Sequence, residues 1–253
     1  MIKLENVVLA SPEQMEFIIQ GMRNPMNSHD RSDSYMNYSV DFENKEDETI
    51  EICYPYYRVG AADVGLMQRL ANAGTDHRKF MRMMPVYVRI TAPLYWWKEF
   101  DTYKVATVAN SCSTMHKIHE KEFTLEDFSC EHLTPRFRNQ LQDVINELNY
   151  LRDKYNHFED EKGMDMGWGY IFDSKKDIWW QMIQLLPSSY NQTRNVMMNY
   201  EVLCNIYKSR KDHKLDCWRD FCKWIEELPY SELICGNPDR PLSPLLDPKY
   251  KED

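Results

Sequence analysis

Two amide side chains and one guanidinium in the C-terminal third of the sequence are suited to binding a nucleotide or a cofactor. They belong to Asn199, Asn205 and Arg210. An Asn amide both donates and accepts hydrogen bonds, so it can hold the edge of a base or a flavin. An Arg can bind a phosphate through two parallel hydrogen bonds. Each residue type is also common on solvated helix surfaces, so residue type alone does not indicate a binding site. The prediction of a site therefore depends on the spacing of the three residues.

We expect a helix over about residues 194–209, after the helix-breaking Pro187. Asn199 and Arg210 are eleven residues apart, which is almost three helical turns, so they would share one face about 16 Å apart. Asn205 would lie about 120° round the helix from that face. The spacing predicts two ligands on one face and a third to the side.

The wider spacing in this region is more informative. Asn199 follows Pro187 by twelve residues, Asn205 follows six residues later, and Arg210 five residues after that. This pattern resembles the C-terminal block of the flavin-dependent thymidylate synthases, also called thymidylate synthase complementing proteins. The resemblance implies that both Asn residues contact FAD and that Arg210 contacts the phosphate or pyrimidine of dUMP. His213 lies one residue from a family His that contacts FAD.

A second block extends the resemblance. Asn110 and Ser113 keep the Asn-x-x-Ser part of the family signature, and the strand-like run of residues 84–94 precedes them, as in the family. The resemblance implies that both residues belong to the nucleotide site, where Ser113 would touch the phosphate or the ring. The alternative for Ser113 is a loop serine that caps a helix.

The sequence also departs from the family at cationic positions. The family's Arg-His-Arg, which holds the flavin, is replaced by Tyr103, Lys104 and Val105. Two family arginines that help to bind dUMP are replaced by Met115 and Ile183. One of the three cationic phosphate ligands is therefore kept. The cations that a rearranged site would offer instead are Lys104, His116, Lys117 and Arg194.

The resemblance implies an activity: FAD-dependent methylation of dUMP to dTMP, or of a related pyrimidine nucleotide. Methylenetetrahydrofolate would supply the carbon and NADPH the electrons, and the assembly would be a homotetramer. The protein would position the nucleotide against the flavin, and no enzyme nucleophile is needed. The alternative is a catalytically inactive paralogue that kept the fold and binds a nucleotide or a partner. A purely structural paralogue is the third possibility.

Other clusters are weaker candidates for chemistry. His116 and His119 are three residues apart near Cys112 and Glu120, but this set lacks the further ligand that would complete a metal site. We therefore predict no metal. Six of the seven Trp residues could stack on a flavin or folate ring, although such residues more often form the core or subunit contacts. They are Trp96, Trp97, Trp179, Trp180, Trp218 and Trp224.

Helices and strands mix along the sequence without βαβ alternation, which indicates an α+β fold. We expect mixed helices around a small, mainly antiparallel sheet that positions the residues above. We expect one domain over residues 1–236, an extended tail over 237–253, and a loop over 24–47. The expected strands cover residues 3–10, 49–57 and 84–94. The other expected helices, besides a short helix or turn over 95–103, cover residues 12–22, 60–73, 133–156, 177–186 and 215–228.

Composition excludes several classes of protein. The chain has 253 residues and a net charge of -9, which disfavours a broad nucleic-acid-binding face but permits a small basic pocket. It has no GxGxxG or GxxxxGK(S/T) phosphate loop. Its seven cysteines include no CxxC pair. We found neither a signal peptide nor an apolar run of about 18 residues, so we expect a cytoplasmic protein that binds no membrane.

Overall fold

The computed structural model describes residues 2–45, 48–158, 164–165 and 171–236. The chain divides into two compact units. The first unit comprises residues 1–3, 89–102 and 110–195, and the second comprises residues 4–88, 103–109 and 196–253. The expected single domain over residues 1–236 stays a prediction, and the expected tail lies outside the described residues.

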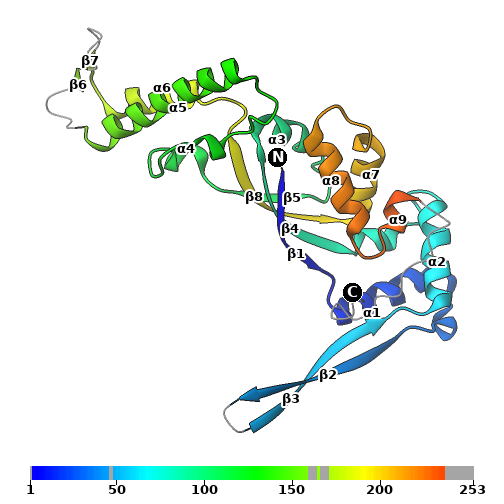
Figure 1. Ribbon diagram of the computed structural model, residues 1–253. Coiled ribbons are helices and arrows are strands. Elements are labelled where there is room, and N and C mark those ends of the chain that lie inside the picture. Colours follow the sequence, from blue (N-terminus) through cyan, green and yellow to red (C-terminus); the bar gives the residue numbers. More distant parts are fainter. Residues whose placement is uncertain (1, 46–47, 159–163, 166–170, 237–253) are drawn as a thin grey trace. The chain divides into compact units, whose positions relative to one another are not determined.

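A four-stranded sheet has the strand order β1–β4–β8–β5 (Figure 1). Its strands are β1 (Lys3–Leu9), β4 (Pro85–Pro93), β8 (Asn191–Asn199) and β5 (Val108–Ser111). In β4, Val86, Val88 and Ile90 are buried while Tyr87 and Arg89 between them are exposed. This alternation is what a strand with one buried face requires. The predicted fold class, with mixed helices around a small, mainly antiparallel sheet, is confirmed.

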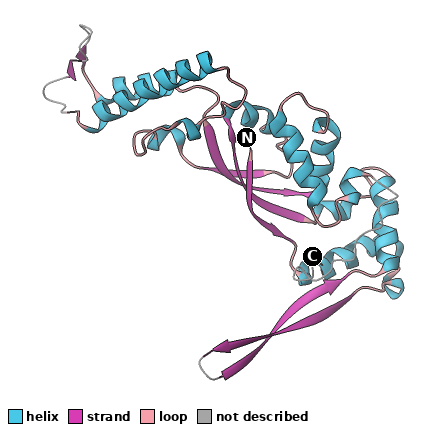
Figure 2. Cartoon of the chain, in the orientation of Figure 1, coloured by secondary structure: helices cyan, strands magenta, loops and turns pink. Residues whose placement is uncertain are grey.

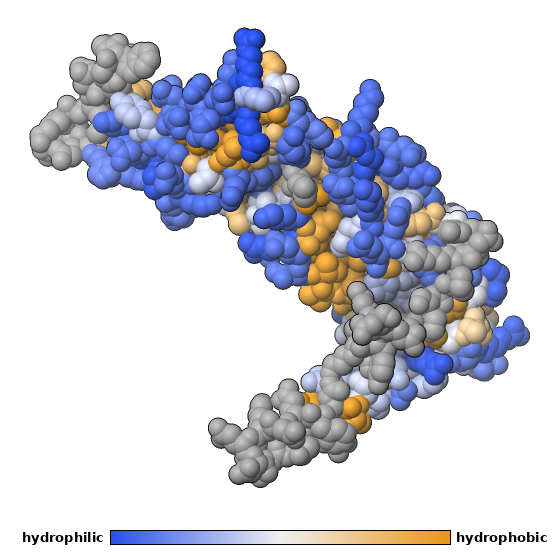
Figure 3. All heavy atoms as spheres, viewed as in Figure 1, coloured by the Kyte–Doolittle hydropathy of each residue, from blue (hydrophilic) through white to orange (hydrophobic). Residues whose placement is uncertain are grey.

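A pair of packed helices dominates the first unit. Helices α5 (Pro135–Asn156) and α6 (Lys175–Leu185) lie side by side (Figure 2). Leu148 of α5 and Ile178 and Met182 of α6 are fully buried in their shared core. Figure 3 shows mainly hydrophilic side chains over the visible face of α5. The remaining elements are α3 (Leu94–Phe100), α4 (Thr114–Lys117), η4 (Leu125–Asp127), β6 (Met164–Asp165) and β7 (Ile171–Phe172).

The second unit contains most of the other helices. They are α1 (Pro12–Arg23), η1 (Asn24–Met26), η2 (His29–Arg31), α2 (Ala61–Asn72), η3 (Lys79–Arg82), α7 (Tyr200–Arg210), α8 (Asp216–Glu227) and α9 (Glu232–Cys235). The predicted start of α1 is confirmed: the Ser11 side chain accepts the Gln14 N–H, and the Gln14 side chain accepts the Ser11 N–H. No helix in the described ranges combines the length and apolar character needed to cross a lipid bilayer.

The prediction of a loop over residues 24–47 is wrong for its second half. Strand β2 (Tyr35–Lys45) pairs antiparallel with β3 (Glu48–Arg58), so that Met36 lies opposite Tyr57. Figure 1 shows this long hairpin, whose two strands both contact α1. The polar residues that suggested a loop are tolerated because a two-stranded ribbon leaves much of its surface in water. The strand depends on its partner for backbone hydrogen bonds, which local composition does not reveal.

A buried ion pair joins α1 to α2. The Arg23 guanidinium lies 2.5 Å from the Asp63 carboxylate, and the two side chains are 5% and 0% exposed. The hydroxyls of Ser32 and Ser34 each donate to the other Asp63 oxygen at 2.6 Å. Arg23 also donates to the Ser28 carbonyl at 3.1 Å. A buried pair is tolerable when its remaining hydrogen-bonding capacity is satisfied in this way.

We predict that Asp63→Asn lowers the free energy of unfolding by about 3–5 kcal/mol, because the Arg23 charge would stay buried without its counter-ion. The control is Asp220→Asn, which removes the exposed partner of Lys223 on α8. That change should cost less than about 1 kcal/mol. Urea denaturation measures both. Equal, small losses would contradict the importance of the buried pair.

Candidate functional site

Asn199 marks a change from strand to helix. It is the last residue of β8, and its side-chain oxygen accepts the Val202 N–H at 3.0 Å, which caps the first turn of α7. The residue is only 6% exposed. The predicted helix over 194–209 is therefore wrong for residues 194–199, which pair within the sheet. Asn199 serves α7 as its N-cap.

Arg210, the last residue of α7, lies beside two aromatic rings of the second unit. Its guanidinium carbon is 5.7 Å from the centre of the Tyr103 ring and 4.7 Å from that of Trp218. Its Nε–H donates to the Tyr103 hydroxyl at 2.9 Å. These contacts are typical of a cation held on aromatic faces. The predicted phosphate ligand is thus in a defined and half-buried setting.

The turn that carries Tyr103 is under backbone strain. Ala106 adopts a φ of 57°, the left-handed region that costs an L-residue about 1 kcal/mol. Trp218, which faces Tyr103 at a centroid distance of 6.0 Å, is fully buried and also contacts Phe221. The Tyr103 ring therefore rests on a rigid aromatic base. A strained turn is retained where its surroundings hold it in place.

The other two residues assigned to FAD lie in different settings. The His213 Nδ1 atom accepts the Leu215 N–H at 3.2 Å, and its ring is 6.3 Å from that of Trp218. His213 and Arg210 thus both contact the Trp218 ring. Asn205 is exposed on α7. Five residues of helix place it about 140° round from Arg210, so the two side chains do not converge on one small group.

Ser113 and Asn110 belong to the first unit. Asn110 is exposed on β5. The Ser113 hydroxyl accepts the His116 N–H at 3.3 Å and caps the short helix α4. The alternative role predicted for Ser113 is therefore present. Their roles as nucleotide ligands stay predictions.

Metal and thiol chemistry are poorly supported near this site. Within the described ranges, no three His, Cys, Asp or Glu side chains gather as metal ligands. Burial, followed by the charge of Glu226, raises the pKa of the Cys222 thiol to about 12 although Arg210 lowers it. This thiol is protonated at neutral pH and is a poor nucleophile.

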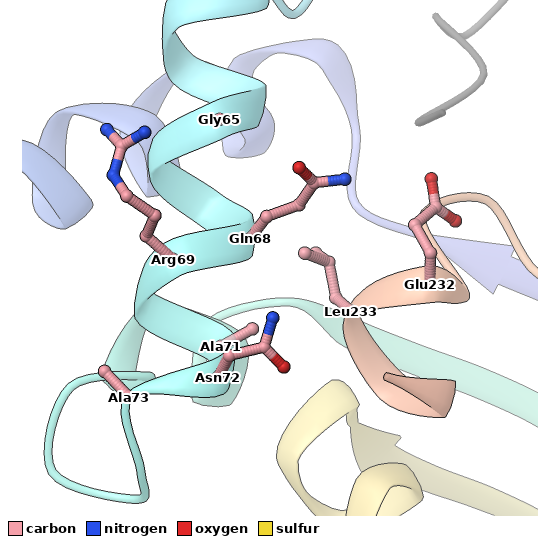
Figure 4. Close-up of a pocket in the computed structure, with 8 residues that line it drawn as sticks. All are labelled: Gly65, Gln68, Arg69, Ala71, Asn72, Ala73, Glu232 and Leu233. Atoms are coloured by element: carbon pink, nitrogen blue, oxygen red, sulfur yellow. The ribbon is translucent and has the colours of Figure 1, made fainter. Parts of the chain in front are cut away.

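A cavity of about 490 Å³ lies between α2 and α9 in the second unit. Figure 4 shows Gln68 and Asn72 pointing toward Glu232 and Leu233, and Arg69 of α2 also lines the cavity. None of the predicted ligands lines this cavity, so it is a poor candidate for the nucleotide site.

Solved structures share this fold. The flavin-dependent thymidylate synthase ThyX from Helicobacter pylori, solved with FAD and dUMP, is 16% identical over 92% of this chain and 96% of its own, with a TM-score of 0.59. A second structure of that protein with the same ligands is 15% identical over 92% and 95% of the chains, with a TM-score of 0.60. No family model and no curated protein matches the sequence.

A further structural neighbour is the UMP/dUMP methylase PolB from Streptomyces cacaoi, solved with 5-Br dUMP. It is 11% identical over 93% of this chain and 95% of its own, with a TM-score of 0.53. The chain therefore has the fold of the flavin-dependent thymidylate synthases. The predicted resemblance is confirmed as a likeness of fold.

The residues present do not match the flavin-binding set that the resemblance implies. The amide oxygen of Asn199 is buried and caps α7, and the Nδ1 atom of His213 accepts a backbone N–H. Where the family has Arg-His-Arg, Lys104 supplies the one cation, and Tyr103 contacts Arg210. We derive no reaction step through FAD from this arrangement.

The sequence did not reveal the aromatic partners of Arg210. Tyr103 was expected to matter only because it stands where the family has a cationic residue. Trp218 was expected in the core or in a subunit contact. A signal was available in the replacement itself, because a tyrosine can accept a hydrogen bond from Arg and also stack on it. The contact joins positions 107 residues apart, so local spacing does not predict it.

We predict that Asn199→Ala lowers the free energy of unfolding by about 1 kcal/mol, because α7 loses its N-cap. Asn199→Asp should retain most of the stability, since Asp is an equally good cap. Asn205→Ala, an exposed change on the same helix, is the control and should change stability by less than about 0.5 kcal/mol. Urea denaturation measures all three. If the two alanine variants lose equal stability, the capping role is refuted.

Proposed function

We propose that this chain binds a pyrimidine nucleoside monophosphate through Arg210 and methylates its base, with dUMP as the first candidate. The observation that carries the proposal is the Arg210 guanidinium, which lies against the Trp218 ring and donates to the Tyr103 hydroxyl at the end of α7. A guanidinium is planar and stays charged, so it suits a phosphate monoester. The shared fold with a dUMP-bound thymidylate synthase and a UMP/dUMP methylase supports this choice.

The tasks proposed for the protein are binding and orientation. Arg210 would fix the phosphate end of the nucleotide. Methylation also needs a carbon donor and a reductant. The family that the chain resembles uses methylenetetrahydrofolate and FAD reduced by NADPH for these tasks, and the turnover experiment below supplies all three because the flavin-binding set is not matched here. Reactants held in a fixed orientation gain rate without a protein nucleophile.

A second candidate function is nucleotide binding without catalysis. It is favoured by the contacts of Tyr103, which stands where the family has part of its flavin-binding Arg-His-Arg and instead bonds to Arg210. Such a paralogue would keep the phosphate ligand and lose the cofactor. The two candidates share nucleotide binding and differ in turnover.

We predict that Arg210→Ala weakens dUMP binding by about 10- to 100-fold, because one charge-assisted phosphate contact is lost. Isothermal titration calorimetry of the full chain measures the affinity. The control is Arg219→Ala, which removes an exposed arginine of α8 that pairs with Asp216. That variant should bind dUMP like the wild type. Equal weakening in both variants, or no dUMP binding by the wild type, would refute the proposed site.

Turnover distinguishes the two candidate functions. The full chain is incubated with dUMP, methylenetetrahydrofolate, NADPH and added FAD, and the nucleotide is examined by mass spectrometry for one added methyl group. A methylated product that depends on Arg210 supports the methyltransferase. Nucleotide binding without product, in a protein whose visible spectrum is unchanged by FAD, supports the binding paralogue instead.

A further inference from the structure

The contacts of Arg210 restrict both its position and its orientation. Trp218 is fully buried, so the ring beneath the guanidinium is fixed by the core of the second unit. Tyr103 adds a second ring and accepts the Nε–H at 2.9 Å. An arginine side chain has several rotatable bonds, and a ring alone does not select the direction of its planar fork. The hydrogen bond to Tyr103 fixes the direction of the Nε–H.

We infer that Tyr103 is a positioning residue for nucleotide binding: its hydroxyl holds the Arg210 guanidinium in the orientation that receives the phosphate. This inference rests on the proposed role of Arg210 as the phosphate ligand. Tyr103 thus acts through Arg210 and makes no contact of its own with the phosphate.

The energetic reason is preorganisation. A free arginine loses side-chain rotational freedom when it binds a ligand, and this cost weakens binding. An arginine already held by a ring and a hydroxyl has lost most of that freedom before the ligand arrives. The inference therefore predicts that the Tyr103 hydroxyl contributes to affinity only while Arg210 is present.

Tyr103→Phe is the decisive variant, because it keeps the ring and removes only the acceptor. It should weaken dUMP binding by about 3- to 10-fold in the wild-type background, the range expected for one hydrogen bond. In the Arg210→Ala background the same change should have no effect on dUMP affinity. A merely structural role would weaken binding equally in both backgrounds, so this double-mutant cycle separates the two.

The matched control is Tyr207→Phe. The Tyr207 hydroxyl on α7 donates to Glu226 at 2.7 Å. Removing it deletes a tyrosine hydroxyl that bonds elsewhere in the same unit and should leave dUMP affinity unchanged. A ligand-free readout accompanies the titrations: the NMR signal of the Arg210 Nε–H should exchange slowly with water in the wild type and in Tyr207→Phe, and quickly in Tyr103→Phe.

The possible outcomes are distinct. A loss of affinity in Tyr103→Phe that disappears in the Arg210→Ala background, together with fast Nε–H exchange, supports the inference. Unchanged affinity in Tyr103→Phe, or an equal effect in both backgrounds, overturns it and leaves Arg210 as the phosphate ligand. If Arg210→Ala binds dUMP as tightly as the wild type, the proposed phosphate site fails and the inference fails with it.

Discussion

The hydrogen bond from the Val202 N–H to the Asn199 side chain fixes where β8 ends and α7 begins. The position of Arg210 in the candidate site follows from that boundary. Eleven residues later, after almost three turns, Arg210 emerges at the end of α7 beside Trp218. The first turn is also tied down, because Glu201 lies 2.6 Å from Arg78 in a buried ion pair. A shifted start would rotate Arg210 by about 100° per residue and remove it from the aromatic rings.

The replacement of a cationic motif by an aromatic residue changes what the neighbouring arginine can do. Several arginines at one site repel one another and need an anion to neutralise them. A tyrosine needs no neutralisation, and it both stacks on Arg210 and accepts its hydrogen bond. The family's Arg-His-Arg would form a broad cationic surface, whereas Tyr103 in this chain orients the single guanidinium of Arg210. That replacement suits a small phosphate more than an extended dinucleotide cofactor, whose diphosphate is held best by several donors.

The sequence predicted the parts of this structure that depend on local patterns. The α1 cap at Ser11 and the buried alternation of β4 are examples, because caps and periodicity act within a few residues. The spacing that ends at Arg210 also led to the correct fold. Strand β2 was missed because its pairing with the following strand β3 outweighed its polar composition. Residues 194–199 were missed because they belong to β8, which pairs with the distant strands β4 and β5. The Tyr103 contact and the ion pair of Arg23 with Asp63 depend on tertiary proximity, which one sequence does not encode in its spacing.

The overall charge of the chain makes the local setting of Arg210 decisive. At a net charge of -9, the protein as a whole repels a doubly charged nucleotide monophosphate. At physiological ionic strength that repulsion is screened beyond about 8 Å, so the groups within one such length of the phosphate determine binding. A guanidinium set against the fully buried Trp218 is partly removed from water, which strengthens its attraction for an anion at contact distance. If Arg210 binds the phosphate as proposed, affinity would depend on the orientation of this one arginine more than on the field of the whole protein.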